Sequence, residues 1–155
     1  MRKKGIVFIL CLVFLILCTN KSIYASNESK KDLEEGYYVI ESALDEGKAL
    51  DLNGISKKNE ENIQLWSKNE GSNQIFEVVY NKDGTYTIKS AFSGKVFDLA
   101  WAGTKNGTNV QVYDESNVNW QKWQIEKTLD NYYQIKLFIY YDKNLLTFVR
   151  NRAIL

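Results

Sequence analysis

An internal repeat with a spacing of 47 to 48 residues constrains the fold of this chain more than any other feature of its sequence. Residues 36–43 and 84–91 are identical at five of eight positions, at a spacing of 48 residues. One residue is then lost, and seven further identities follow at a spacing of 47 residues, ending with Gln74 and Gln121. Agreement that keeps its register through a deletion indicates a duplication, so we expect structural units that pack against one another.

A third copy of the repeat begins at the expected spacing, but its later residues no longer match the pattern. Three of the residues 133–136 match the second copy at a spacing of 47 residues. Leu145, however, stands where the repeat predicts a carboxylate, and the third copy of the glutamine would fall at about position 168, beyond Leu155. We therefore expect two complete units and a truncated or divergent third, with the bounds 36–83, 84–131 and 132–155.

Residues 1–25 have the pattern of a secretory signal peptide. A basic start precedes a 13-residue apolar run, and a small residue, Ala25, ends the segment, so cleavage is expected after about Ala25. The apolar run is short against the roughly 20 residues of a membrane-spanning helix, which makes an uncleaved anchor the weaker alternative. Lipid attachment at Cys18 is disfavoured because Leu17, rather than a small residue, precedes it. The mature protein is therefore expected to be extracellular, with no membrane insertion.

Removal of the signal peptide changes the composition of the remaining chain. Both cysteines lie within the signal peptide, so no disulfide could stabilise the mature protein. The net charge falls from +1 to −3, because four of the 20 basic residues and none of the 19 acidic residues are lost. Basic and acidic residues are interspersed, which argues against nucleic-acid binding. The polar residues 26–35 are expected to form a disordered leader, and residues 36–155 are enough for one small domain.

The chain contains no histidine. Together with the loss of cysteine, this removes the commonest general base, the thiol nucleophile and most transition-metal ligands. We therefore expect no catalytic residue, no cofactor and no metal site. The remaining enzymatic alternative is glycoside hydrolysis by a pair of carboxylates, Asp51 and Asp98. Their equivalent places in separate units would hold them much farther apart than the roughly 5–10 Å that this reaction needs, so an enzyme is not expected.

Short segments rich in β-branched and aromatic residues dominate the repeat, and turn-forming clusters separate them. No stretch has a sustained apolar period of about 3.6 residues, which would indicate a helix. These features predict an all-β domain. The predicted strands are residues 37–41, 77–80, 85–89, 109–113, 123–126 and 132–139.

The repeated motifs occur in the same order in both units. In the second unit they are Gly84–Leu99, Asn109–Tyr113 and Asn119–Trp123. In the first they are Lys48–Leu52, Gln64–Trp66 and Asn73–Phe76. This ordered combination resembles the ricin B-type lectin (Q-x-W) repeats of bacterial secreted proteins, over residues 36 to about 136. The resemblance implies a β-trefoil, in which three units surround a pseudo-threefold axis and each is able to carry a shallow sugar site.

A neutral sugar requires hydrogen-bond acceptors and donors for its hydroxyls and an aromatic ring for its apolar face. By the resemblance, Asp51 would anchor a hydroxyl pair and Trp66 would stack on the sugar. Gln64 and Asn73 would complete the hydrogen bonds, and Gln74 would support the site from behind. The structural alternatives are that Trp66 is a core residue and that Asp51 serves only the following turn.

The second unit keeps Asp98, Gln111, Tyr113 and Gln121, which gives it a weaker predicted sugar site. Trp120 replaces the amide of the first unit, which removes a donor–acceptor pair and is able to block the site. The third unit lacks the carboxylate, and no site is expected there.

The aromatic residues of the Q-x-aromatic motifs are expected to serve the core. Phe76 and Trp123 alternate with Val78 and Ile125 at the period of a strand, so all four side chains point to one face. They would then position the sugar-binding loops without contacting sugar.

The resemblance favours a secreted, metal-independent lectin for glycans or polysaccharide, with galactose-type sugars as the first candidates. It would act alone or within a larger toxin or glycoside hydrolase assembly. Two alternatives remain open from the residues alone. The first is a trefoil that docks another protein without binding sugar, and the second is a truncated gene product without function.

Overall fold

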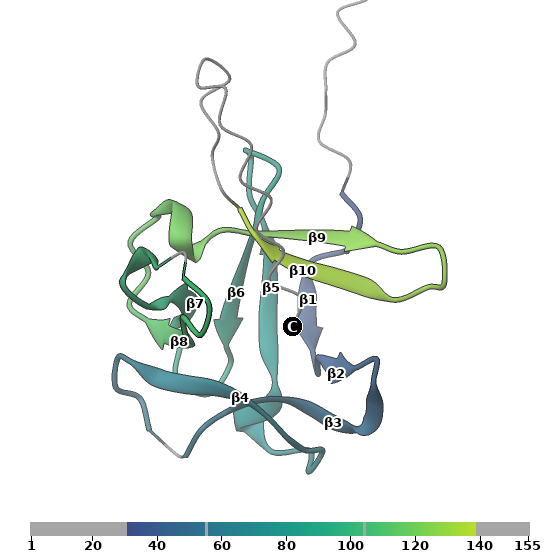
Figure 1. The fold of residues 1–155 in the computed structure, drawn as a ribbon, viewed down its shortest axis with the longest axis horizontal. Helices are drawn as coiled ribbons and strands as arrows, with labels where there is room; N and C mark the ends of the chain where they lie inside the picture. Colours follow the sequence, from purple (N-terminus) through teal and green to yellow (C-terminus); the bar gives the residue numbers. More distant parts are fainter. Residues whose placement is uncertain (1–30, 55, 104, 139–155) are drawn as a thin grey trace, which may run out of the picture.

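The computed structural model describes residues 31–54, 56–103 and 105–138, which fold into short antiparallel strands joined by turns (Figure 1). The strands, in chain order, are β1 (Gly36–Tyr38), β2 (Glu41–Ser42), β3 (Asp45–Leu52), β4 (Glu61–Ser67), β5 (Phe76–Tyr80), β6 (Tyr86–Ser90), β7 (Val96–Leu99), β8 (Val110–Tyr113), β9 (Trp123–Lys127) and β10 (Tyr133–Leu137). Three single 3₁₀ turns interrupt them: η1 (Ser72–Gln74), η2 (Ala100–Ala102) and η3 (Asn119–Gln121).

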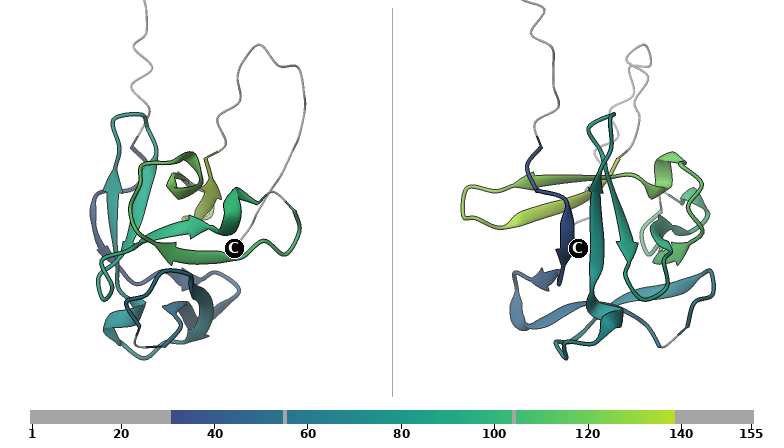
Figure 2. Two further views of the ribbon diagram at one scale, coloured as in Figure 1. Left: turned by 90° about the vertical axis from the view of Figure 1, so that its left-hand side faces the viewer. Right: turned by 180° about the vertical axis from the view of Figure 1, so that it is seen from behind.

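The first and last strands of each repeat form a central sheet. Its antiparallel order is β1, β5, β6, β9 and β10, and β5 and β6 run side by side through the middle of the molecule (Figures 1 and 2). The inner strands of each repeat form hairpins, β3 with β4 and β7 with β8, and the two hairpins join where β4 pairs with β8. This arrangement is a β-trefoil with two complete repeat units and a divergent third, as the sequence predicts.

The core lies where the alternating apolar side chains of the central strands meet. Phe76 and Trp123 are 0% and 2% exposed, which confirms that the Q-x-aromatic rings are core residues. Phe97 packs edge-on between them, with ring centroids 5.0 Å from Phe76 and 6.2 Å from Trp123. Edge-to-face contacts of this kind stabilise a core beyond the apolar area that they bury. The remaining core members are Leu52, Ile63, Val78, Tyr86, Ile88, Val112 and Ile125.

The inner hairpins contain strands that the sequence patterns did not predict. β3 reads Asp-Glu-Gly-Lys-Ala-Leu-Asp-Leu, a composition with few strand-forming residues at its start. Its pairing with β4 sets its conformation, and Asp51 lies in this strand opposite Gln64. The alternative that Asp51 serves only a turn is therefore wrong.

The predicted signal peptide and the segment 139–155 lie outside the described residues. Of the expected leader, residues 31–35 are described, and they contact the sheet. Leu33 packs against the core, its backbone N–H donates to Tyr86 Oη at 3.0 Å, and that hydroxyl donates to the Leu33 carbonyl at 3.2 Å. The folded part of the chain therefore begins before Gly36. Over the described ranges, there is no helix of the length and apolarity that crossing a membrane requires.

Candidate functional sites

Each complete unit presents one buried carboxylate on the first strand of its inner hairpin. Asp51 on β3 lies opposite Gln64 on β4, and Asp98 on β7 lies opposite Gln111 on β8. In both pairs the glutamine Nε2 donates to the aspartate Oδ1 at 3.1 Å. The hairpin pairing thus creates the same carboxylate–amide pair twice.

The glutamines of the Q-x-aromatic motifs hold these carboxylates from the protein side. Gln74, which is fully buried, donates from Nε2 to Asp51 Oδ2 and to the Ser67 carbonyl, both at 2.9 Å. Its Oε1 accepts the backbone N–H of Asn69 at 2.9 Å. Because the one amide ties together the carboxylate and the loop after β4, it fixes the shape of the site.

Gln121 makes the equivalent contacts in the second unit. Its Nε2 donates to Asp98 Oδ2 and to the Asp114 carbonyl, both at 3.0 Å, and its Oε1 accepts the Ser116 N–H at 2.8 Å. The duplication therefore extends to individual hydrogen bonds.

The structure brings the predicted residues of the first unit together. Asn73 on η1 donates from Nδ2 to Asp51 Oδ2 at 2.8 Å, so this carboxylate accepts three amide bonds and is only 2% exposed. Trp66 lies two residues beyond Gln64 on β4, which places both side chains on the same face of the strand. Because Trp66 is 55% exposed, the alternative that it belongs to the core is wrong.

The second unit has an open cavity beside its carboxylate, with a volume of about 370 Å³. Trp120 occupies the place that Asn73 has in the first unit, so Asp98 receives two amide bonds where Asp51 receives three. The Trp120 side chain is 39% exposed and forms part of the cavity wall without closing the cavity. The residues that line it are Glu60, Asp98, Trp101, Ala102, Gln111, Tyr113, Ser116, Trp120 and Gln121.

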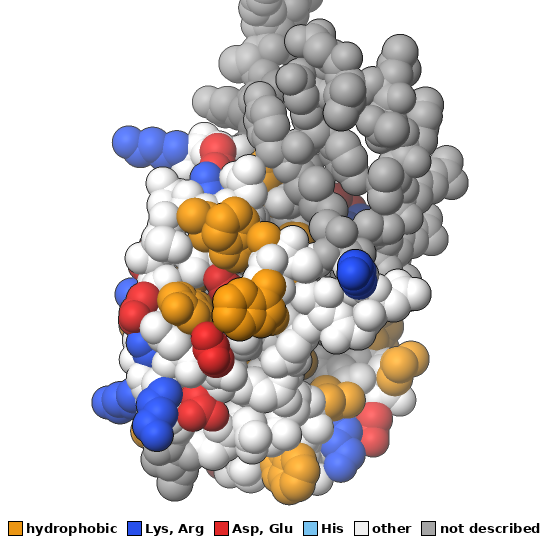
Figure 3. Space-filling model, turned by 60° about the vertical axis from the view of Figure 1, so that its left-hand side comes forward, with side chains coloured by type: hydrophobic (Ala, Val, Ile, Leu, Met, Phe, Trp, Pro, Cys, Tyr) orange, Lys and Arg blue, Asp and Glu red, His pale blue; other side chains and the backbone are white. Residues whose placement is uncertain are grey.

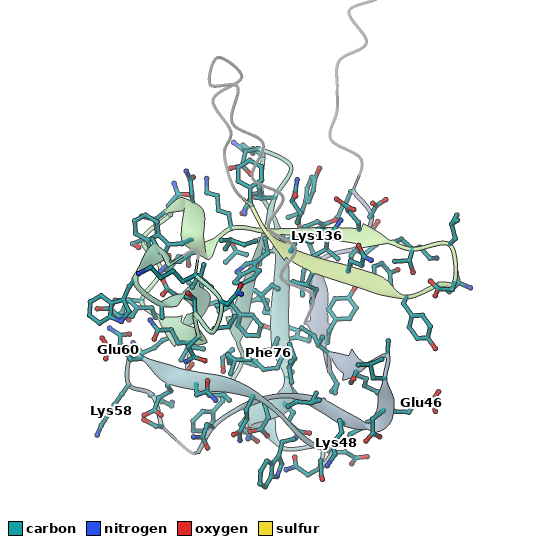
Figure 4. The ribbon with its side chains drawn as sticks, viewed as in Figure 1. Glu46, Lys48, Lys58, Glu60, Phe76 and Lys136 are labelled. Atoms are coloured by element: carbon teal, nitrogen blue, oxygen red, sulfur yellow. The ribbon has the colours of Figure 1, made fainter. Side chains whose placement is uncertain are left out.

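Four of these lining residues, Glu60, Trp101, Ala102 and Ser116, were not predicted from the sequence, and Glu60 and Trp101 have the largest side chains among them. Trp101 follows β7, is 89% exposed and has a φ of 57°. Glu60, with a φ of 71°, belongs to the first unit and lies at the end of β4 nearest β8 (Figure 4). In Figure 3, hydrophobic side chains gather beside acidic ones on this side of the molecule. The repeat contained a signal for both, because Gly54 and Gly107 occupy the equivalent positions in the other unit.

No lysine or arginine side chain lines the second cavity. Lys95 Nζ donates to Asp114 Oδ1 at 2.5 Å, outside the cavity lining. This bond, together with one from Asn59, holds the pKa of the Asp114 carboxyl below its usual range. The cavity itself is lined by two carboxylates and three aromatic rings, with no lysine or arginine. Within the described part of the chain, no cluster of three or more acidic side chains has the geometry to hold a metal ion.

The fold and the paired carboxylate–amide sites define a β-trefoil of the lectin class. The sequence model of the ricin-type beta-trefoil lectin domain-like family matches residues 27–113 and, in a second match, residues 73–138. The chain belongs to this family, whose general function is to bind carbohydrate. No curated protein matches its sequence.

Three solved structures illustrate the similarity. The designed threefold-symmetric protein ThreeFoil is 31% identical, with a TM-score of 0.59, over 67% of this chain and 71% of that one. A Polyporus squamosus lectin bound to a human-type influenza-binding epitope is 27% identical, with a TM-score of 0.58, over 69% and 38%. An exo-β-1,3-galactanase from Clostridium thermocellum is 29% identical, with a TM-score of 0.54, over 60% and 20%. The chain thus spans well under half of the lectin and of the galactanase.

Proposed function

We propose that this protein is a secreted lectin that binds glycan through one site in each complete unit. The first site comprises Asp51, Gln64, Trp66, Asn73 and Gln74, and the second comprises Asp98, Gln111, Tyr113 and Gln121. The observation that carries the proposal is the repeated carboxylate, which two or three amides hold beside an exposed aromatic ring.

The geometry suits sugar hydroxyls because the carboxylates are fixed before a ligand arrives. A carboxylate has about four acceptor positions, and the amides of the protein fill two of them on Asp98 and three on Asp51. The remaining positions can accept hydroxyl donors in charge-assisted bonds. An adjacent ring, Trp66 or Tyr113, can cover the C–H face of the sugar. On this count the second site has more free acceptor capacity, and it opens into the cavity.

Galactose-type sugars are the first ligands to test, and the similarity to a galactanase is compatible with them. The similarity to part of a longer enzyme also supports a role as the binding component of a larger assembly. We propose that the domain itself binds without catalysis, because its two carboxylates are each held by amides in separate hairpins. The expected signal peptide supports extracellular action.

A glycan array tests this function. We expect the purified protein to bind a restricted set of glycans, with galactose-terminated members among them. Trp66→Ala and Tyr113→Ala should each reduce the signal by roughly threefold to tenfold, because each removes the stacking ring of one site. Tyr37→Ala is the matched control, since Tyr37 is 67% exposed on β1, away from both sites, and its loss should leave the signal unchanged.

The outcome also separates the alternatives. A protein that gives a folded circular dichroism spectrum and binds no glycan on the array would contradict the lectin proposal and favour a protein-docking trefoil. An unfolded spectrum would favour a gene product without function.

A further inference from the structure

Three of the residues that line the second cavity, Glu60, Trp101 and Ala102, have left-handed backbone conformations although none is a glycine. Glu60 and Trp101 have φ values of 71° and 57°, in the left-handed region that favours glycine. Their counterparts at the 47-residue spacing are glycines, Gly107 with a φ of 82° and Gly54 with a φ of 72°. A non-glycine residue in this region costs about 1–2 kcal/mol. Both strained side chains line the same cavity, which is the pattern expected where strain serves a binding site.

The carboxylate of Glu60 is available to a ligand. It is exposed, and among the described residues it takes part in no ion pair and no side-chain hydrogen bond. Asp98 lies in the wall of the same cavity, 4% exposed, with only its two amide partners. The cavity therefore holds two carboxylates that form no ion pair with a lysine or arginine of the described residues.

Three aromatic rings accompany these charges. Trp101, Tyr113 and Trp120 all line the cavity and are 89%, 37% and 39% exposed. The face of an aromatic ring attracts a cation, most strongly for tryptophan. Carboxylates and aromatic faces hold a neutral sugar by hydrogen bonds and stacking. A protonated amine adds the electrostatic attraction of both groups for a cation, whereas an anion is repelled.

We infer that the cavity of the second unit selects a sugar that carries a free, protonated amine, such as a galactosaminide. The inference rests on the proposed lectin function, because Asp98 and Gln111 must hold the sugar ring. Glu60 and the indoles of Trp101 and Trp120 then supply the preference for the amine over a hydroxyl at the same place.

The first unit provides an internal comparison. At the places of Trp101 and Trp120 it has Gly54 and Asn73, so two of the three rings are missing. Asp51 also accepts a third amide bond, from Asn73. The preference for an amine should therefore belong to the second unit alone.

A titration with three matched sugars tests the inference. Tryptophan fluorescence would be followed while the full protein is titrated with methyl galactosaminide, methyl N-acetylgalactosaminide or methyl galactoside, in a buffer that keeps the free amine protonated. We expect the galactosaminide to bind about threefold to tenfold tighter than the galactoside. The N-acetyl sugar, which has no charge, should not share this advantage.

Two variants that each replace a glutamate by glutamine locate the effect. Glu60→Gln keeps the shape of the side chain and removes its charge, so the ratio of galactosaminide to galactoside affinity should fall at least twofold. Glu46→Gln is the matched control, because Glu46 lies exposed at the far end of the β3–β4 hairpin and its loss should leave the ratio unchanged (Figure 4).

Each outcome decides between the two proposals. Equal affinity of the wild-type protein for the two sugars, or an equal fall of the ratio in both variants, would overturn the amine preference. The galactoside would still bind in that case, and the lectin function would stand. Absence of binding by all three sugars, together with a silent glycan array, would overturn both.

Discussion

The buried carboxylates Asp51 and Asp98 are held by donors that belong to their own unit. A buried charge is tolerated only when hydrogen bonds replace the water that it has lost. Each unit meets this requirement with its own two glutamines. The first unit adds a third amide, that of Asn73. Among the described residues, no buried side-chain polar atom lacks a partner. The glutamines are therefore needed for the fold as well as for the site. The Asn73 amide is dispensable for the fold, because the second unit folds with Trp120 at the equivalent place.

This difference predicts unequal effects of two substitutions near Asp51. Gln74→Ala removes three hydrogen bonds from a fully buried place, so we expect a loss of about 2–3 kcal/mol in the free energy of unfolding. Asn73→Ala removes two bonds from a half-buried place, where the second unit manages without an amide, and should cost about 1 kcal/mol. Urea unfolding followed by circular dichroism measures both. Equal losses of stability in the two variants would contradict the conclusion that Gln74 matters more to the fold than Asn73.

At the scale of elements, the turn after β7 illustrates a balance between stability and binding. Trp101 occupies a left-handed position in this turn and is 89% exposed, so it contributes little to the core. The corresponding turn after β3 has Gly54, and a Cβ atom placed there would meet no heavy atom within 4 Å. The backbone conformation alone therefore distinguishes glycine from other residues at these two positions.

We accordingly expect Trp101→Gly to raise the free energy of unfolding by about 1 kcal/mol, because it relieves the left-handed strain. The same change should lower galactosaminide affinity roughly threefold to tenfold, because it removes a ring from the cavity. Gly54→Ala is the reciprocal control and should lower stability by about 1 kcal/mol. Urea unfolding and fluorescence titration provide the two measurements. A loss of stability in Trp101→Gly would show that the indole serves packing instead.

The same elements explain how much could be read from the sequence. The outer strands of each unit, such as β5 and β9, alternate buried and half-exposed residues, so their patterns predicted them directly. β3, β4 and β7 were missed. β3 and β7 each contain a buried aspartate, whose hydrogen bonds come from glutamines of the partner strand and of a 3₁₀ turn and so cannot be seen within the strand's own sequence. The glycine counterpart of Glu60 in the repeat marks its left-handed backbone, but the repeat does not show that Glu60, in the first unit, lies beside the site of the second unit.

At the scale of the whole molecule, contacts between units are as informative as those within them. β4 of the first unit pairs with β8 of the second, through Asn62 and Gln111 among others. Asn59 also donates from Nδ2 to Asp114 Oδ2 at 2.9 Å. These contacts bring Glu60 to the second cavity. The duplicated units thus share one site, and its properties depend on their relative position.

A second junction between the units predicts a dependence of stability on pH. Asp83, in the turn between β5 and β6, accepts a bond from Lys122 Nζ at 2.7 Å and two from Thr85. Burial raises the pKa of the Asp83 carboxyl, but the bonds from Lys122 and Thr85 outweigh it and leave the pKa below its usual range. A lowered pKa in the folded state stabilises the protein above the pKa of the unfolded state, and the contribution is lost as the pH falls.

We therefore expect Asp83→Asn to lower the free energy of unfolding at pH 7, and the difference from the wild-type protein to shrink below about pH 4. The difference should be at most about 0.5 kcal/mol, because Asp83 is 41% exposed and water screens the ion pair. Urea unfolding at several pH values measures it. Lys122→Gln should produce a similar loss at pH 7, and the double variant should lose less than the sum of the two, because both changes break one interaction. A difference that persists unchanged at low pH would instead assign the effect to the packing of the turn.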